Sequence, residues 1–325
     1  MDSSSQDSGL VRSPRVGLAL GSGSARGWSH IGVIRVLERA GVSPDIVCGT
    51  SIGALVGAAY AAGELDPLET WVRTLTRQAV VGFLDVRFGG GLITGTRLFD
   101  HLGAHFTDPG ITRLGKTYGA VATDLATGRE VWLRDGPVLE AVRASVAIPG
   151  LFTPARQGER LLVDGGLVNP VPVSLCRALG ADIVIAVNLN EDLLERRQRE
   201  ATRSADASTG VAALMAKLRT ERRPRARKPE ALSPSMLEVL TTSLSIMQVS
   251  ITRTRLASEP AEVVIRPCLS DFALMDFNRA AEAIAEGQRA AEQALPEISE
   301  LLAAAGPARG EESVPRNRVE ESSLR

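Results

Sequence analysis

The stretch that decides the fold lies at residues 45–63, which read DIVCGTSIGALVGAAYAAG. Its first part, DIVCG, is short and apolar, as is typical of a buried strand, and IGALVGAAYAAG predicts a helix that ends at Gly63. A Gly-x-Ser-x-Gly sequence stands between them, so the chain passes from strand to helix within a few residues. We therefore expect a sharp, glycine-marked turn with Ser51 at its tip.

Two interpretations of this turn remain open on local sequence. A serine at a sharp strand-to-helix turn needs glycine two residues before and two after, here Gly49 and Gly53, because larger residues would collide with the neighbouring elements. Ser51 would then present a nucleophilic hydroxyl at the N-terminus of a helix, whose dipole favours developing negative charge. Alternatively, Thr50 or Ser51 only caps the helix and the glycines allow close packing.

The same alternation of strand and helix precedes this turn. Residues 15–21 (RVGLALG) form an apolar run, and from Arg26 apolar residues recur at helical steps until Gly41. Strand–helix–strand–helix order implies parallel strands joined by right-handed crossovers, so we predict an α/β domain. Further along, the pattern predicts helices at 67–79, 96–106, 137–147, 172–179, 233–256 and 277–304, strands at 160–166, 181–189 and 262–267, and a hairpin of 118–125 with 130–134.

We expect one domain, at residues 15–304, with polar segments around it. Residues 1–14 are polar and rich in serine, and residues 305–325 form a polar tail, so both are predicted to be disordered. Residues 191–231 are charged, contain proline and include the basic run KLRTERRPRARK (217–228). We predict a flexible insertion there, whose basic run is either solvated or attracts anionic lipid head groups.

Composition and charge argue against several classes of protein. The 325 residues carry a net charge of −1, whereas nucleic-acid binding needs a clear basic excess, and 4% aromatic residues are too few for a base-stacking platform. The N-terminal stretch MDSSSQDSGLVRSPR lacks the apolar core of a signal peptide. The longest apolar stretch, 52–62, is too short to span a bilayer. We therefore expect a cytoplasmic protein.

The three cysteines, Cys48, Cys176 and Cys268, are widely separated and sit among apolar residues. They form no C-x-x-C pair, the spacing that would indicate a zinc or redox site. We expect them to be buried free thiols rather than disulfide partners or metal ligands.

Three glycine-marked turns each follow a predicted strand: GSGSARG at 21–27, GTSIG at 49–53 and DGG at 164–166. In a parallel sheet the carboxyl ends of the strands share one edge, and ligands bind there. We therefore expect the three turns to meet in one crevice. Such convergence is more specific than any single motif.

A nucleophilic Ser51 needs a group that takes its proton. The only histidines are His30, His101 and His105, and none stands late in the chain, where a serine–histidine–aspartate triad of this type would need one. We expect them to be solvated or partly buried. Asp164 ends an apolar strand, and desolvation would raise its pKa above the usual value of about 4 and make it a better base. The alternative for Asp164 is a turn residue that bonds its own backbone.

The glycine-rich turn at 21–27 also has two interpretations. Successive glycines after a strand allow backbone N–H groups to converge on an anion, which in acyl transfer would be the oxyanion. A side chain in the left-handed backbone of such a nest would be strained, and Ser22 and Ser24 occupy two of its positions. A dinucleotide-binding fingerprint fits less well, because Arg26 stands at the sixth position and Gly27 at the seventh.

Five stretches together resemble the patatin-like phospholipases: LALGSGSARGWSHIGVIRVLE, GTSIGALVGAAYA, RASVAIPGLFTP, LVDGGLVNPVPV and GADIVIAVNL. The resemblance is to short bacterial members of the RssA type, which are related to the catalytic domain of neuropathy target esterase. It covers residues 15–190 strongly and 232–303 more loosely. It implies a three-layer α/β/α fold with a mostly parallel central sheet, a serine nucleophile elbow and a Ser-Asp dyad that hydrolyses acyl esters of lipids.

The resemblance also implies roles for individual residues. Ser51 corresponds to the nucleophile and Asp164 to the general base that accepts its proton. The oxyanion is expected to lie against amides of about Gly23, Ser24 and Ala25. The complete motifs are the oxyanion loop Gly21, Ser22, Gly23, Ser24, Ala25, Arg26 and Gly27, the elbow Gly49, Thr50, Ile52 and Gly53, and the turn Asp164, Gly165 and Gly166.

The activity implied is hydrolysis of phospholipids, lysophospholipids or related lipids through an acyl-serine, with no metal or organic cofactor. The expected partner is a lipid substrate approached from a membrane or micelle surface, which leaves open peripheral association with the inner face of the membrane. Two alternatives remain: a catalytically weak member of the fold that binds lipid or protein, and a serine acyltransferase. Residues 147–154 (AIPGLFTP) would either line an acyl groove or pack in the core.

Overall fold

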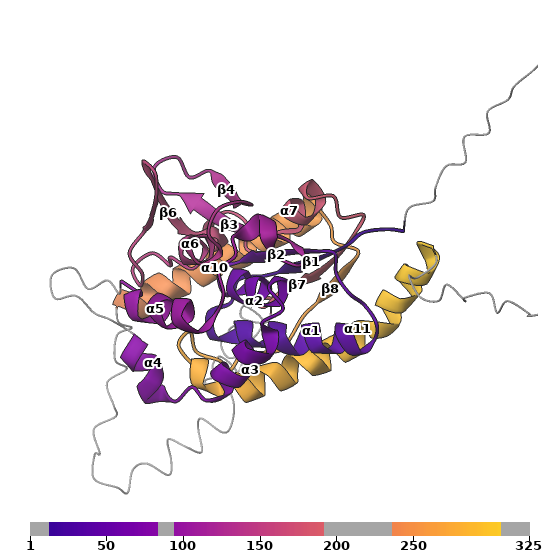
Figure 1. Cartoon of the computed structure of the whole chain (residues 1–325), viewed down its shortest axis with the longest axis horizontal. Helices are drawn as coiled ribbons and strands as arrows, with labels where there is room; N and C mark the ends of the chain where they lie inside the picture. Colours follow the sequence, from indigo (N-terminus) through magenta and orange to yellow (C-terminus); the bar gives the residue numbers. More distant parts are fainter. Residues whose placement is uncertain (1–12, 84–93, 192–235, 307–325) are drawn as a thin grey trace, which may run out of the picture.

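The computed structural model describes residues 13–83, 94–191 and 236–306. They form three layers, in which one sheet lies between two layers of helices (Figure 1). The strands follow the order β5-β6-β3-β2-β1-β7-β8, and β4 pairs with β3. Neighbours among β1, β2, β3, β7 and β8 are parallel, so the predicted α/β fold with a mostly parallel sheet is confirmed. The bounds are β1 (Val16–Leu20), β2 (Ile46–Thr50), β3 (Thr117–Asp124), β4 (Glu130–Leu133), β5 (Ala155–Gln157), β6 (Arg160–Asp164), β7 (Ile183–Val187) and β8 (Val263–Ile265).

Helices cover both faces of the sheet. Figure 1 shows α1 and α11 on one side of it and α7 on the other. The helices are α1 (Ser29–Arg39), α2 (Ile52–Ala61), α3 (Leu65–Arg73), α4 (Arg77–Phe83), α5 (Thr96–His105), α6 (Val138–Ser145), α7 (Val173–Ala178), α10 (Met236–Ser258) and α11 (Ala280–Ala304). Short 3-10 turns lie at η1 (Ser24–Trp28), η2 (Ile111–Arg113), η3 (Gly165–Leu167) and η4 (Phe277–Arg279).

The buried side chains divide into two clusters, one on each face. In β1, Leu18 and Leu20 belong to the cluster that contains α1, α2 and α11, whereas Ala19 faces the cluster that contains α7. Successive strand side chains point to opposite faces, so a strand covered on both sides must be apolar throughout. This explains why the strand patterns RVGLALG and ADIVIAVNL carry few polar residues.

The strand that ends at Asp164, β6, runs in the opposite direction to the one predicted. β6 is antiparallel to β3, with Ala122 opposite Asp164, so the prediction that all three turns follow parallel strands is wrong for this one. Thr50, the last residue of β2, pairs with Val121, and β3 continues beyond it to Asp124. β6 pairs with this overhang from the opposite direction, which brings Asp164 to the level of Ser51.

The helix expected at 67–79 is two helices, α3 and α4. The Thr74 hydroxyl donates to the Trp71 carbonyl at 2.7 Å, and the Thr76 hydroxyl accepts the Ala79 amide at 3.1 Å. Threonine hydroxyls that bond nearby backbone groups in this way compete with helix hydrogen bonds, so one helix ends and the next begins.

Cys48 and Cys176 are buried free thiols, as predicted, but Cys268 is exposed because it lies in the loop after β8 rather than in the strand. Apart from their edges, the predicted disordered segments 1–14 and 305–325 and the insertion 191–231 with its basic run lie outside the described residues. Among the described helices, none has the length and apolar character that crossing a bilayer requires.

Candidate active site

Ser51 forms the tip of a strained turn between β2 and α2. Its φ of 58° and ψ of −125° lie in a region that non-glycine residues rarely adopt, at a cost of about 1–3 kcal/mol. A Cβ at Gly49 would lie 2.3 Å from the Gly53 carbonyl oxygen, and one at Gly53 would lie 2.2 Å from that of Leu20. Close backbone approach therefore requires both glycines, as the sequence predicts.

Helix α6 holds this turn through a residue that sequence reasoning missed. The amide of Ser51 donates to the Ser145 hydroxyl at 2.8 Å, which in turn donates to the Val121 carbonyl at 2.6 Å. A signal existed, because Ser145 stands among the buried positions of α6 with Ala141 and Val142, where a polar group needs a partner. Since the Ser51 amide is committed, it is not available to an oxyanion.

The structure brings Ser51 and Asp164 into direct contact. The Ser51 hydroxyl donates to Asp164 Oδ2 at 2.6 Å, across 113 residues of sequence. Asp164 Oδ1 accepts the Gly166 amide at 2.7 Å, and the Thr123 hydroxyl donates to the Asp164 carbonyl at 2.8 Å. Asp164 therefore accepts a hydrogen bond from its own turn and one from Ser51 at the same time, although the sequence analysis treated these two roles as alternatives.

Burial controls the chemistry of this carboxyl. Asp164 is 2% exposed and Ser51 4%. Desolvation of Asp164 raises its pKa to about 6, while the hydrogen bonds from Ser51 and Gly166 act in the opposite direction. A carboxyl with a pKa closer to neutral is a stronger base than an ordinary aspartate and is still ionised at pH 7.

The three histidines have partners other than the Ser51 hydroxyl. His30 is buried, and its Nε2 donates to the Gly21 carbonyl at 2.8 Å; burial lowers its pKa to about 4, so it is neutral at pH 7. His101 and His105 stack on each other in α5, with ring centroids 4.1 Å apart. Among the described residues, no hydrogen bond joins a histidine to Ser51, and no group of three or more His, Cys, Asp or Glu side chains is placed to hold a metal ion.

The carbonyl groups of the oxyanion loop, residues 21–27, point to donors behind it. Gly21 accepts from His30, Ser22 accepts from Asn190 Nδ2 at 3.2 Å, and Gly23 accepts from Arg26 Nε at 3.1 Å. Because C=O and the following N–H point in opposite directions in a trans peptide, the amides of Gly23 and Ser24 are turned away from Asn190 and Arg26.

Most other amides of the loop already have acceptors: Gly21 bonds Val187, Ser22 bonds Pro170, Ala25 bonds Leu274 and Arg26 bonds Gly23, all at 2.8–3.3 Å. This corrects the expectation for the Ala25 amide. The amides of Gly23 and Ser24 have no acceptor within the described part of the chain. Two adjacent N–H groups therefore remain to bind an anion beside Ser51.

Arg26 fixes the loop from behind. Its side chain is 6% exposed and bonds the carbonyls of Gly23 and Leu189 at 3.1 Å and Asn190 Oδ1 at 3.0 Å. The guanidinium thus connects the loop to the residues that follow β7. Asn190, which sequence reasoning did not single out, bonds both the loop and Arg26.

The predicted strain is present at one of the two loop serines. Ser24 and Ser51 are the non-glycine residues with positive φ in the described ranges, and φ of Ser24 is 52°. Its hydroxyl donates to the Leu274 carbonyl at 2.6 Å. No sequence pattern pointed to Leu274, because it lies in an irregular loop far along the chain.

Ser51 stands where two cavities meet. An almost wholly apolar cavity of about 100 Å³ extends from it on one side, and a smaller, more polar one of about 30 Å³ lies on the Asp164 side. Residues 147–154 contribute to the apolar cavity rather than only to the core. Its walls include Trp28, Ile52, Leu55, Trp71, Phe83, Leu98, Phe99, Ile148, Leu151, Phe152, Met275 and Phe277, and those of the polar cavity include Ser22, Gly23, Ser24, Asp164, Ser245 and Gln248.

Fold and site together define an α/β protein with a serine at a sharp strand-to-helix turn, a buried carboxylate partner and a glycine-rich loop in which two described amides have no acceptor. Residues 18–177 match the family "Patatin-like phospholipase". The chain is 33% identical to an uncharacterized NTE family protein of Mycobacterium tuberculosis, over 87% of this chain and 92% of that protein. The chain belongs to the patatin-like phospholipase family, and the predicted resemblance is confirmed.

Other relatives extend the comparison. Identity is 30% to patatin-like phospholipase domain-containing protein 6 of Homo sapiens, over 81% of this chain and 19% of that much longer one. Among solved structures, VipD from Legionella pneumophila aligns with a TM-score of 0.38 and 11% identity, over 92% of this chain and 89% of VipD. At the level of the family, the match of residues 18–177 supports the expected class of activity, lipid hydrolysis.

Proposed function

We propose that this protein is a serine acyl hydrolase that cleaves the ester bonds of phospholipids, lysophospholipids or related lipids through Ser51 and Asp164. The observation that carries the proposal is the 2.6 Å hydrogen bond between the Ser51 hydroxyl and Asp164 Oδ2. It stands at the junction of an apolar and a polar cavity and beside two uncommitted amides.

The first step is attack of Ser51 Oγ on the ester carbonyl carbon while its proton passes to Asp164 Oδ2. Negative charge then develops on the carbonyl oxygen, and the amides of Gly23 and Ser24 would hold it. One such donor contributes about 3 kcal/mol to the transition state. Because the loop is already fixed by Arg26, little reorganisation is needed at that moment.

The intermediate then collapses, and the bond between the carbonyl carbon and the leaving alcohol breaks. Asp164 returns the proton to that alcohol, leaving an acyl group on Ser51. Water attacks the carbonyl carbon of the acyl-serine while Asp164 accepts a proton from it. The bond between that carbon and Ser51 Oγ then breaks, Asp164 returns the proton to Ser51 Oγ, and a fatty acid departs. The two residues are therefore sufficient for both halves of the reaction.

The two cavities suggest how a lipid lies in the site. The apolar walls beside Ser51 suit an acyl chain, since burial of each methylene contributes about 0.8 kcal/mol. The polar cavity beyond Asp164, with Ser245 and Gln248 of α10, suits the leaving alcohol. We propose that such a substrate comes from a membrane or micelle surface.

Replacing the nucleophile tests the proposal directly. Ser51→Ala should abolish hydrolysis of p-nitrophenyl acyl esters and prevent labelling by a fluorophosphonate probe, which reacts only with an activated serine. The matched control is Ser243→Ala, at an exposed serine of α10, which should retain full activity. Circular dichroism and thermal unfolding establish that both variants fold.

Turnover that survives in Ser51→Ala would disprove the proposal. A folded wild-type protein that neither turns over esters nor reacts with the probe would favour a binding role for the fold. Analysis of products in the presence of added alcohols or lysolipids separates hydrolysis from acyl transfer, because a transferase would form a new ester instead of a free fatty acid.

A further inference from the structure

Ser24 is held by a segment that reaches the site from far along the chain. The Ser24 hydroxyl donates to the Leu274 carbonyl at 2.6 Å, and the Ala25 amide donates to the same oxygen at 3.3 Å. Leu274 lies 250 residues after Ser24, in the loop between β8 and η4. One carbonyl therefore fixes two consecutive residues of the oxyanion loop.

This support matters because the backbone of Ser24 is strained. Its φ of 52° lies in the left-handed region, which residues with a side chain rarely occupy. Relaxation to a right-handed or extended backbone would turn the neighbouring peptide groups and redirect the Ser24 amide. The hydroxyl bond to Leu274 opposes that relaxation, which explains how a serine can occupy this position.

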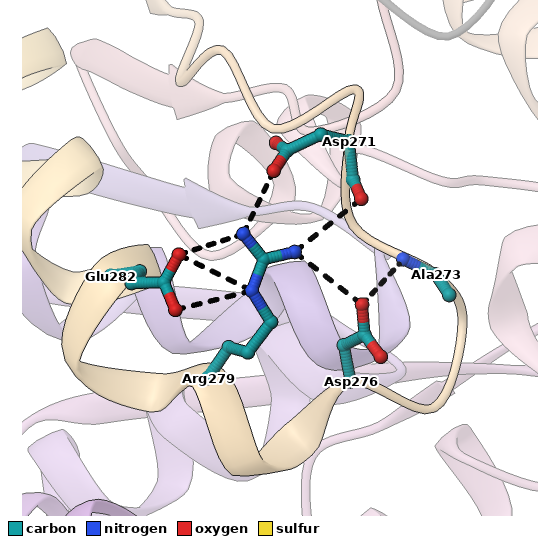
Figure 2. Close-up of polar contacts among 5 residues, drawn as sticks. All are labelled: Asp271, Ala273, Asp276, Arg279 and Glu282. Atoms are coloured by element: carbon teal, nitrogen blue, oxygen red, sulfur yellow. Dashed lines mark hydrogen bonds and ion pairs between the residues drawn. The ribbon is translucent and has the colours of Figure 1, made fainter.

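Arg279 gathers several acidic groups around the loop that carries Leu274 (Figure 2). Its Nη2 lies 2.8 Å from Asp271 Oδ2 and 2.7 Å from Glu282 Oε2, and its Nη1 lies 3.5 Å from Asp276 Oδ2. The guanidinium also stacks over the Phe272 ring, 3.9 Å from the centroid. A planar guanidinium suits such a multiple contact, whereas an ammonium group does not.

These contacts close the loop on both sides of Leu274. Asp271 precedes Leu274 and Asp276 follows it, so one side chain draws the two flanks of this carbonyl together. The Asp276 carboxylate also accepts the Ala273 amide at 3.0 Å, as Figure 2 shows. The loop is therefore fixed by side chains, because it lies outside helices and strands.

The same loop forms part of both cavities at Ser51. Leu274 lines the polar cavity, whereas Met275 and Phe277 line the apolar one. The Phe277 carbonyl accepts the indole N–H of Trp28 at 3.1 Å, which joins the end of the loop to η1. Displacement of this loop would therefore change the site without any change in Ser51 or Asp164.

We infer that Arg279 is a positioning residue for the proposed hydrolysis. It keeps the Leu274 carbonyl in place, and that carbonyl holds Ser24 in the strained conformation that directs its amide to the oxyanion. The inference rests on the proposed function. No hydrogen bond or ion pair among the described residues joins Arg279 to Ser51, so its effect on catalysis passes through Leu274 and Ser24.

A double-mutant cycle tests whether Arg279 acts through Ser24. Arg279→Ala and Ser24→Ala should each lower kcat on a soluble p-nitrophenyl ester by about tenfold with little change in KM, because the lost support is needed mainly in the transition state. In the double variant the loss should stay near tenfold, because both substitutions break the same connection. A loss near a hundredfold, the product of two independent effects, would overturn the inference.

Arg39→Ala is the control, because Arg39 also pairs with an acidic residue of α11, Glu292, at 3.5 Å, and no hydrogen bond among the described residues joins either side chain to the loop. It should leave kcat unchanged. Rates are compared well below each unfolding midpoint, and Asp271→Asn replaces Arg279→Ala if that variant does not fold. Ser51→Ala separates the two failures: if it is inactive and the cycle is additive, only the role of Arg279 is wrong.

Discussion

At the scale of single residues, Asp164 is under opposing requirements. It must be ionised to accept the Ser51 proton, yet burial raises its pKa from 3.8 to about 6. The native state therefore binds this proton more tightly than the unfolded chain. Tighter proton binding by Asp164 stabilises the folded state by about 3 kcal/mol below about pH 4. This stabilisation is lost as pH rises through about 6.

We therefore expect Asp164→Asn to lose activity and gain stability. In urea unfolding, the free energy of unfolding of Asp164→Asn should exceed that of the wild type by close to zero near pH 4. The difference should grow up to about pH 6 and then stay constant, because asparagine never ionises. Wild-type kcat/KM should rise with pH over the same range. Asp100→Asn, on the exposed side of α5, is the control and should change neither quantity. A stability difference that does not vary with pH would contradict this account.

At the scale of elements, the site depends on how α6 meets the turn after β2. Ser145 of α6 bonds the Ser51 amide, and both groups are buried. Ser145→Ala should leave that amide without a partner, which costs about 1–3 kcal/mol of stability. The turn would also relax from its strained conformation, so we expect kcat to fall about tenfold.

Urea unfolding and steady-state kinetics measure the two effects of Ser145→Ala separately. Ser145→Cys offers a comparison of similar size but weaker hydrogen bonding and should lie between alanine and the wild type. If Ser145→Ala keeps wild-type kcat and loses only stability, then α6 supports the fold and does not position the nucleophile.

At the scale of the whole molecule, α1 and α11, the first and last α-helices of the described residues, pack so closely that their backbones are in contact. A Cβ at Gly287 of α11 would lie 2.0 Å from the Ser29 carbonyl oxygen, and one at Gly32 of α1 would lie 2.0 Å from that of Ile284. The opposing atoms belong to helix backbones, which cannot yield as a side chain can. Helix α11 thus packs directly on α1, in the buried cluster on the same face of the sheet.

Gly287→Ala should therefore destabilise the protein by about 3 kcal/mol, the upper range for overpacking, despite the better helix propensity of alanine. Gly103→Ala in α5 is the matched control, because its Cβ would meet only Leu139 at 3.5 Å, an ordinary contact. It should be neutral or stabilising by up to about 1 kcal/mol in chemical denaturation. Equal effects of the two substitutions would refute close packing between α1 and α11.

Most of the fold was predictable because its signals are local. The apolar runs of β1, β2 and β7 identify strands buried on both faces, and the helix bounds of α2 and α5 follow from their glycines and periodicity. The break between α3 and α4 was missed, because threonine side chains ended a helix within an apolar pattern. The exposure of Cys268 was missed for a similar reason, since its apolar neighbours stand in a loop.

The sequence by itself determined the turn around Ser51, because steric limits on Gly49 and Gly53 act between residues close in the chain. Only the tertiary structure decided where Asp164 lies, because strand direction follows from pairing with the free end of β3 and not from the residues of β6. The same holds for Leu274, which reaches Ser24 across 250 residues. A strained backbone can be recognised locally, but the groups that support it come from wherever the folded chain places them.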